Sequence, residues 1–146
     1  MEKVWKLSNL YLGTLRELAL IHQHSHWTTK GSTFYGDHLV FERVYKSAAE
    51  DADLVAEKLI GVFGGKSVSF DLQHGIMHKV SKRYSGLREQ PVEMSLKAEK
   101  DFITLSDYFY DFLEKENKMT LGLDDMIMSV ASNREASCYL LQQMLK

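Results

Sequence analysis

Five side chains that are able to bind a metal ion lie between residues 26 and 57. His38, Glu42, Asp53 and Glu57 are separated by 4, 11 and 4 residues, and His26 lies a short distance upstream. At about 100° per residue, the four later side chains occupy one stripe of a helix, roughly 100° wide. Imidazole nitrogens combined with carboxylates suit iron or zinc. The spacing therefore indicates a metal site carried largely by one helix.

The length of that helix predicts two half-sites instead of one complete site. Glu42 and Asp53 are roughly 16 Å apart along a helix that rises about 1.5 Å per residue. One ion cannot contact both, so His26, His38 and Glu42 form one set and Asp53 and Glu57 the other. A two-fold dimer with antiparallel copies of this helix would join each set to the partner's complement. Such a dimer would hold two sites at its interface.

Two alternatives compete with this interpretation. A di-iron site inside the bundle of one chain uses Glu-x-x-His pairs, and the nearest form here is Asp71-x-x-His74. That site is therefore disfavoured. The second alternative is that the acidic residues are ordinary solvated charges, with Glu42 paired to Lys46 one turn later. The metal hypothesis depends on all five ligands occurring together.

Hydrophobic periodicity predicts four long helices and one short one. The long segments cover residues 8–30, 36–64, 92–117 and 123–146, and the short one covers 72–84. Ser8 or Asn9 is a candidate cap for the first helix, and the Gly64-Gly65 pair is a natural stop for the second. We expect an all-α fold with a single domain over residues 1–146. The architecture is a ferritin-like four-helix bundle, with the short helix in the crossover between the second and third long helices.

Composition narrows the class of protein further. The chain has 146 residues, 45% of them hydrophobic, and a formal net charge of −2. That balance does not favour nucleic-acid binding through a basic body. The one cysteine, Cys138, excludes an intrachain disulfide. No apolar run approaches the length of a membrane span and no signal peptide is apparent, so we expect a cytoplasmic protein without a membrane partner.

The stretch from His26 to Gly65 resembles a known family. It reads HWTTKGSTFYGDHLVFERVYKSAAEDADLVAEKLIGVFGG. The pattern of His-Trp, a Lys-Gly turn, Phe, then His, an acid four residues later and a final Asp-x-x-x-Glu is similar to the Dps proteins (DNA protection during starvation), which are dodecameric mini-ferritins. The match covers about 40 residues without a gap, whereas the remaining chain is similar mainly in helix order and length.

This resemblance implies a ferroxidase that stores iron. His26, His38 and Glu42 would come from one subunit, and Asp53 and Glu57 from its dimer partner. Ferrous iron would be oxidised, preferentially by hydrogen peroxide, and the ferric product would be stored inside a hollow homo-oligomer, a dodecamer built from two-fold dimers. Glu42 stands where many members carry aspartate. Zinc is a possible competitor for the same ligands.

Three further positions have a role implied by the resemblance and an ordinary alternative. Trp27 matches a tryptophan thought to quench radicals, and the alternative is plain core packing. Asp125 matches one acid of the family's iron-entry pore, with Asp124 beside it, whereas the other pore acids are not evident; the alternative is that both aspartates favour a helix N-terminus.

The DNA-binding role in the family's name is doubtful here, because only Lys3 and Lys6 precede the expected first helix. Two rival functions stay open, a DNA-shielding shell and a zinc-bound structural assembly without redox turnover. His22, one turn before His26, is interpreted as a hydrogen-bonded interior histidine, with a place beside the metal as the alternative.

Overall fold

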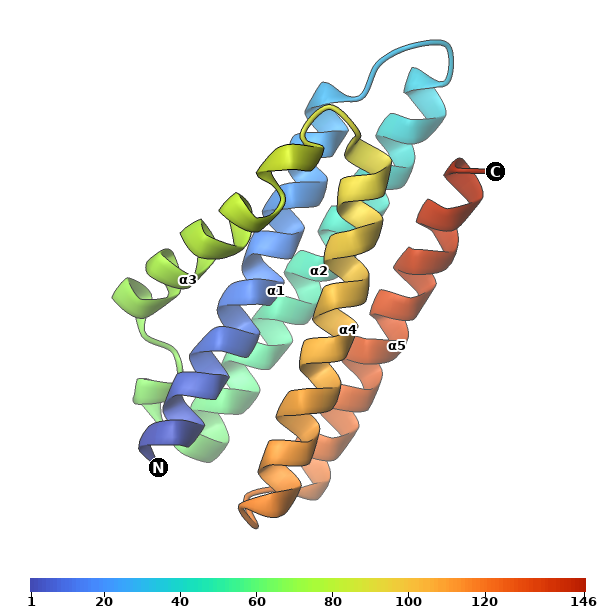
Figure 1. Ribbon diagram of the computed structural model, residues 1–146. Coiled ribbons are helices and arrows are strands. Elements are labelled where there is room, and N and C mark those ends of the chain that lie inside the picture. Colours follow the sequence, from blue (N-terminus) through green and yellow to red (C-terminus); the bar gives the residue numbers. More distant parts are fainter.

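The computed structural model describes all 146 residues and consists of four long α-helices and one shorter one (Figure 1). In chain order the elements are α1 (Glu2–Thr28), α2 (Phe34–Phe63), the single-turn 3-10 helix η1 (Gly65–Ser67), α3 (Phe70–Arg83), the single-turn η2 (Ser85–Leu87), α4 (Pro91–Lys115) and α5 (Leu121–Met144). There is no strand, so the predicted all-α class is confirmed. None of the helices combines the length and the apolar character needed to cross a bilayer.

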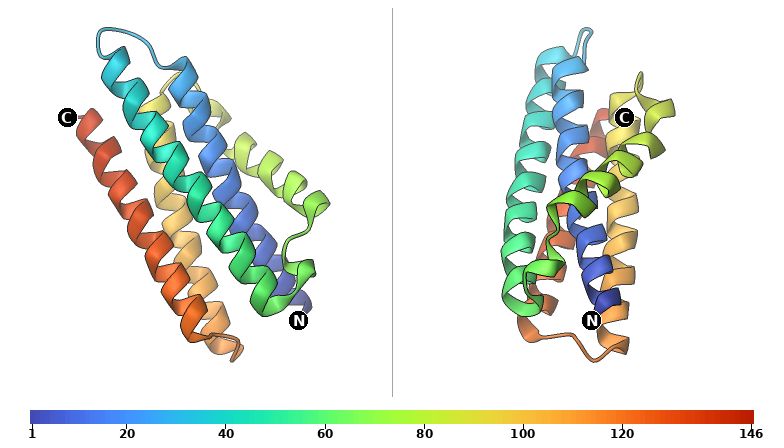
Figure 2. Two further views of the ribbon diagram at one scale, coloured as in Figure 1. Left: turned by 180° about the vertical axis from the view of Figure 1, so that it is seen from behind. Right: turned by 90° about the vertical axis from the view of Figure 1, so that its left-hand side faces the viewer.

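The four long helices form a closed ring of neighbours. α1 packs against α2 and α4, and α5 packs against the same two helices from the other side. α2 and α4 run in the same direction, so the chain must return along the length of the bundle between them (Figure 1). α3 lies in this crossover and packs on the outer side of α1 (Figure 2). A four-helix bundle with one long crossover is the ferritin-like topology, as the sequence predicted.

A core of 23 buried side chains holds the bundle together. Tyr11 lies near its middle, with its ring 4.9 Å from that of Phe102 and 4.8 Å from that of Phe109. Because fully buried aromatic and aliphatic side chains each contribute about 1.5–3 kcal/mol, this core fixes the relative positions of α1, α2 and α4. The five predicted metal ligands lie on α1 and α2, so the core holds them on a rigid frame.

The N-terminal boundary of the first helix was predicted wrongly. α1 begins at Glu2 and not at residue 8, and both Ser8 and Asn9 are fully buried inside it. Asn9 therefore caps nothing. Its amide donates to the carbonyl of Lys66 at 2.9 Å, and its side-chain oxygen accepts from the backbone N–H of Ser69 at 2.7 Å. Asn9 thus attaches the start of the crossover to α1.

Two glycines explain how the crossover is shaped. Gly64 ends α2 with φ +85°, a left-handed conformation that glycine adopts without strain. Gly13 lies where α3 passes close to α1, and a Cβ at this position would stand 2.9 Å from Cγ2 of Ile76. α3 therefore approaches α1 more closely than a larger residue would allow.

Candidate metal-binding half-sites

His26 and His38 form a stacked pair where α1 ends and α2 begins. Their ring centroids are 3.7 Å apart with an interplanar angle of 14°. Nδ1 of His26 lies 2.7 Å from the carbonyl oxygen of His38, and Nδ1 of His38 lies 2.8 Å from the carbonyl oxygen of His26. A carbonyl can only accept, so both Nδ1 atoms carry the proton. In each neutral ring, Nε2 then keeps its lone pair for a metal.

The local chain path produces this pairing. The connection between α1 and α2 is short and passes through Gly31 at φ +105°, which brings the end of one helix beside the start of the next. Phe34 stacks on His38 with centroids 5.0 Å apart, and Tyr45 packs against His26 at 5.4 Å. The two imidazoles are therefore held from both sides, and their orientation is set before any ligand binds.

Glu42 follows His38 by one turn and stays ionised. Its Oε1 accepts from Nζ of Lys46 at 2.6 Å. This hydrogen bond and the positive charge of Lys46 are the main reasons that the pKa of Glu42 lies below its ordinary value, and the two histidines add to the effect. The pairing with Lys46 that the sequence allowed is therefore present. The carboxylate is anionic beside two imidazoles, which is the state that a metal ligand requires.

Asp53 and Glu57 lie further along α2 and are exposed. Neither carboxylate takes part in a side-chain hydrogen bond or an ion pair within the chain. Asp53 is at the edge of a groove, and Glu57 borders a shallow depression beside Leu54 and Lys58. Both groups are thus free to accept a ligand from outside the subunit.

The structure does not bring the five predicted ligands together in one subunit. All of them except His26 are on α2, and His26 joins His38 and Glu42 at the first end of that helix. No group of three metal-binding side chains converges within the chain. A single subunit therefore presents two separate sets of candidate ligands.

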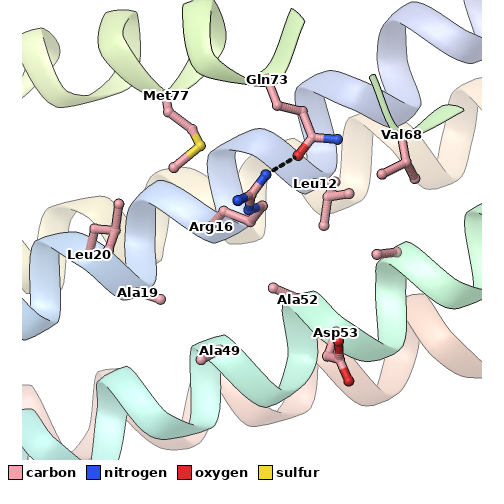
Figure 3. Close-up of a pocket in the computed structure, with 11 residues that line it drawn as sticks. Leu12, Arg16, Ala19, Leu20, Ala49, Ala52, Asp53, Val68, Gln73 and Met77 are labelled. Atoms are coloured by element: carbon pink, nitrogen blue, oxygen red, sulfur yellow. Dashed lines mark hydrogen bonds between the residues drawn. The ribbon is translucent and has the colours of Figure 1, made fainter. Parts of the chain in front are cut away.

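An open groove runs beside Asp53, between α1, α2 and α3 (Figure 3). It has a volume of about 470 Å³, and its lining is mostly apolar: Leu12, Arg16, Ala19, Leu20, Ala49, Ala52, Asp53, Ala56, Val68, Gln73 and Met77. The sequence interpretation missed this groove. A usable signal was the run of alanines at 49, 52 and 56, since small residues three and four apart leave a hollow along one helix face.

Trp27 is 65% exposed in the subunit. It lies in the last turn of α1, next to His26. The alternative of plain packing in the subunit's own core is therefore wrong, because a core residue would be shielded from solvent. An indole this exposed beside an incomplete ligand set remains available to a second subunit.

Asp124 and Asp125 lie in the first turns of α5 and differ in their surroundings. Thr120 caps the helix, accepting the N–H of Leu123 at 3.0 Å. Asp124 is half-buried and accepts from the hydroxyl of Tyr110 at 3.1 Å, whereas Asp125 is exposed. The placement agrees with the helix N-terminus interpretation for Asp124, the acidic residue in the first turn of α5, and Asp124 also ties α5 to α4.

His22 is fully buried, and its ring contacts Ser95 at 3.0 Å and Glu99 at 2.9 Å. The interpretation as a hydrogen-bonded interior histidine is confirmed. The sequence analysis did not identify its partner Glu99, nor Arg134, which contacts the same carboxylate at 3.0 Å. No local spacing joins these residues, because they come from α1, α4 and α5.

A four-helix bundle with this crossover helix has a ferritin-like fold, and the arrangement of its helices is Dps-like. The X-ray structure of Dps from Thermosynechococcus elongatus matches 99% of this chain and 91% of its own, with a TM-score of 0.80. Sequence identity over the match is 15%, so the likeness establishes the fold. No family model matches the sequence, and no curated protein is similar to it at the level of sequence.

Proposed function

We propose that this protein oxidises ferrous iron at sites shared by two subunits and stores the ferric product in a hollow homo-oligomeric shell. The observation that carries the proposal is the reciprocal hydrogen bonding of His26 and His38. Each Nδ1 is engaged by the other residue's carbonyl oxygen, so both rings keep Nε2 available for a metal ion. Such fixing of the tautomer and the ring orientation is typical of histidines that bind metals.

The second subunit supplies the remaining ligands in this proposal. The two ligand sets on α2 are separated by roughly 16 Å, so two antiparallel copies of α2 place each set against the other copy's complement. The groove beside Asp53 supports this arrangement, because it is lined by small apolar side chains on the same helix face. Leu54 and Trp27 are exposed apolar groups near the two sets, and a second copy of the chain would cover them.

The paired site suits peroxide as the oxidant. Two ferrous ions each give up one electron, and hydrogen peroxide takes both with two protons to form two waters. Removing both electrons at one place avoids the one-electron reduction that releases hydroxyl radical. The carboxylates of Glu42, Asp53 and Glu57 favour the more highly charged ferric product electrostatically. We propose that Trp27, next to His26, intercepts stray one-electron oxidation.

The direct test is anaerobic oxidation of ferrous iron by hydrogen peroxide on metal-free protein of measured particle mass. We expect fast oxidation that consumes two irons per peroxide, on a particle close to twelve subunits. Zinc added first should inhibit, because it occupies the same ligands without changing oxidation state. Oxidation no faster than in a protein-free control, on correctly assembled protein, would contradict the ferroxidase proposal.

A further inference from the structure

A cluster of charged side chains lies in the centre of the bundle, apart from the half-sites on its surface. His22 comes from α1, Asp51 from α2, Glu99 from α4 and Arg134 from α5. His22, Glu99 and Arg134 have no exposed surface, and Asp51 is 5% exposed. Charged groups are almost never this buried unless they are paired. Each of the four long helices thus contributes one side chain to this interior cluster, and Arg134 lies between the carboxylates of Asp51 and Glu99.

Arg134 is the centre of this cluster. Its Nη1 donates to Oε1 of Glu99 at 3.0 Å, and its Nη2 donates to Oγ of Ser47 at 2.6 Å. The same Nη2 lies 3.5 Å from Oδ2 of Asp51. His22 reaches the same oxygen of Glu99 at 2.9 Å. Arg134 therefore bridges carboxylates from two different helices, and it shares Oε1 of Glu99 with the imidazole of His22.

The bonding of the cluster is incomplete. Oε2 of Glu99, Oδ2 of Asp51 and Nε of Arg134 are buried and have no hydrogen-bond partner. A buried polar atom without a partner costs about 1–3 kcal/mol, so such atoms are unusual in a well-packed interior. Burial also raises the pKa of Asp51 above its ordinary value, because desolvation outweighs its contacts with Asn133 and Arg134. The two carboxylates have more acceptor capacity than the guanidinium satisfies.

Carboxylates and a histidine projecting inward from different helices are the donors that bind divalent metals inside four-helix bundles. Here the cation among them belongs to the protein. We propose that the guanidinium of Arg134 occupies the cation position of a carboxylate–histidine site at the bundle centre, and so prevents a divalent metal from binding there. A guanidinium and a metal ion at contact distance repel strongly in a low-dielectric interior. This inference does not depend on the proposed function of the surface half-sites.

Removal of Arg134 tests the inference, with the surface ligands silenced. In a His38→Ala/Glu57→Ala background the full-length protein, freed of metal by chelation, is titrated with cobalt(II) chloride. We expect no bound cobalt while Arg134 is present. With Arg134→Met added, we expect about one cobalt per subunit, a visible absorption spectrum of nitrogen and oxygen ligation, and a thermal midpoint that rises on cobalt addition.

Two matched variants separate cation replacement from simple loss of a salt bridge. Arg134→Lys keeps the charge and should bind no cobalt. Glu99→Gln, added to Arg134→Met, removes a ligand and should abolish the cobalt spectrum. Arg134→Gln retains polar contacts in the interior, so it replaces Arg134→Met in the experiment if the Arg134→Met protein does not fold.

A purely structural role predicts destabilisation without any gain of metal. If neither Arg134→Met nor Arg134→Gln binds more cobalt than the background, the inference is overturned. It is equally overturned if the background binds cobalt in the bundle while Arg134 is intact.

Discussion

The stacked histidines illustrate how backbone carbonyls fix the tautomer of a candidate metal ligand. A free imidazole can present either nitrogen, but Nδ1 of His26 and Nδ1 of His38 each donate to a carbonyl at 2.7 or 2.8 Å. The choice of tautomer is therefore made by the fold. Hydrogen bonds that orient a metal-binding imidazole are worth about 10–100-fold in affinity or activity, so direct removal of a ligand should cost at least as much.

His38→Ala and Glu57→Ala should each slow iron oxidation by about ten-fold or more, with the fold intact because neither side chain is in the core. Mixing the two variants tests whether each site is formed by two subunits. A dimer of one Glu57→Ala subunit and one His38→Ala subunit contains one complete site and one doubly defective site.

Random co-assembly of the two inactive variants should therefore restore about a quarter of the wild-type rate. The rate is measured by stopped-flow absorbance after joint refolding, with exposed His24→Ala as the control that stays active. Full loss in the mixed protein would mean that the ligands act within one chain.

At the residue scale, prediction from the sequence succeeded where the relevant neighbours are local. The spacing along one helix was enough to place Glu42 one turn after His38 and to anticipate its contact with Lys46. It was not enough for Arg134, whose contacts with Glu99 and Asp51 join residues 35 and 83 positions apart. Such contacts are fixed by packing of helices, and no periodicity within one segment encodes them.

Among the elements, the position of α3 depends on the missing side chain of Gly13. Gly13→Ala places a Cβ 2.9 Å from Cγ2 of Ile76, so α3 must move outward. We expect a loss of about 1–3 kcal/mol in unfolding free energy and faster amide hydrogen exchange within α3. Gly75→Ala, on α3 itself, meets nothing within 4 Å and should stabilise by up to about 1 kcal/mol. Similar effects of both variants on exchange would contradict the close-packing argument.

The contact between α1 and the crossover also predicts a pH dependence. Burial raises the pKa of Glu17 from 4.5 to about 7, although Arg88 partly opposes this. A raised carboxyl pKa means that the folded state holds the proton more tightly. The contribution of protonated Glu17 to the unfolding free energy is fully present below about pH 4.5 and is lost as pH rises through about 7.

Glu17→Gln should therefore be more stable than the wild type at pH 8 by about 1–2 kcal/mol, after allowance for partial solvent screening. At pH 5 the difference should nearly vanish. Urea denaturation at the two pH values measures it, with the exposed Glu116→Gln as control. An equal gain at both pH values would show that desolvation of the charge is not the cause.

Helix boundaries show what sequence patterns resolve at this scale. The end of α2 was placed correctly because a glycine pair ends it, and Pro91 marks the first residue of α4. The start of α1 was misplaced because Ser8 and Asn9 resemble caps. Asn9 instead serves the crossover, through bonds to residues 57 and 60 positions away. A capping residue and a long-range anchor have the same side chain, and only the tertiary structure distinguishes them.

For the whole molecule, the two separate ligand sets and the groove together predict that iron oxidation depends on the pairing of subunits. Four long amphipathic helices, few breakers and one long connection were enough to predict the bundle and its crossover. They did not reveal that α3 packs on α1 and leaves a groove along α2. In the proposed assembly that groove receives a second copy, so pairing of subunits and oxidation of iron should fail together.

Ala49→Glu tests this coupling. Ala49 is exposed in the subunit and lines the groove, so a glutamate there is harmless to an isolated chain. If position 49 lies within a dimer interface, the new glutamate becomes a buried, unpaired carboxylate, which costs several kcal/mol. We expect particles of lower mass by analytical ultracentrifugation, unchanged helix content by circular dichroism, and iron oxidation close to the protein-free rate. Ala136 on α5 is also exposed, so Ala136→Glu should leave the subunit pairs intact and preserve oxidation. Normal pairing of the Ala49→Glu protein would place the interface elsewhere, and retained oxidation by its separated subunits would show that one chain suffices.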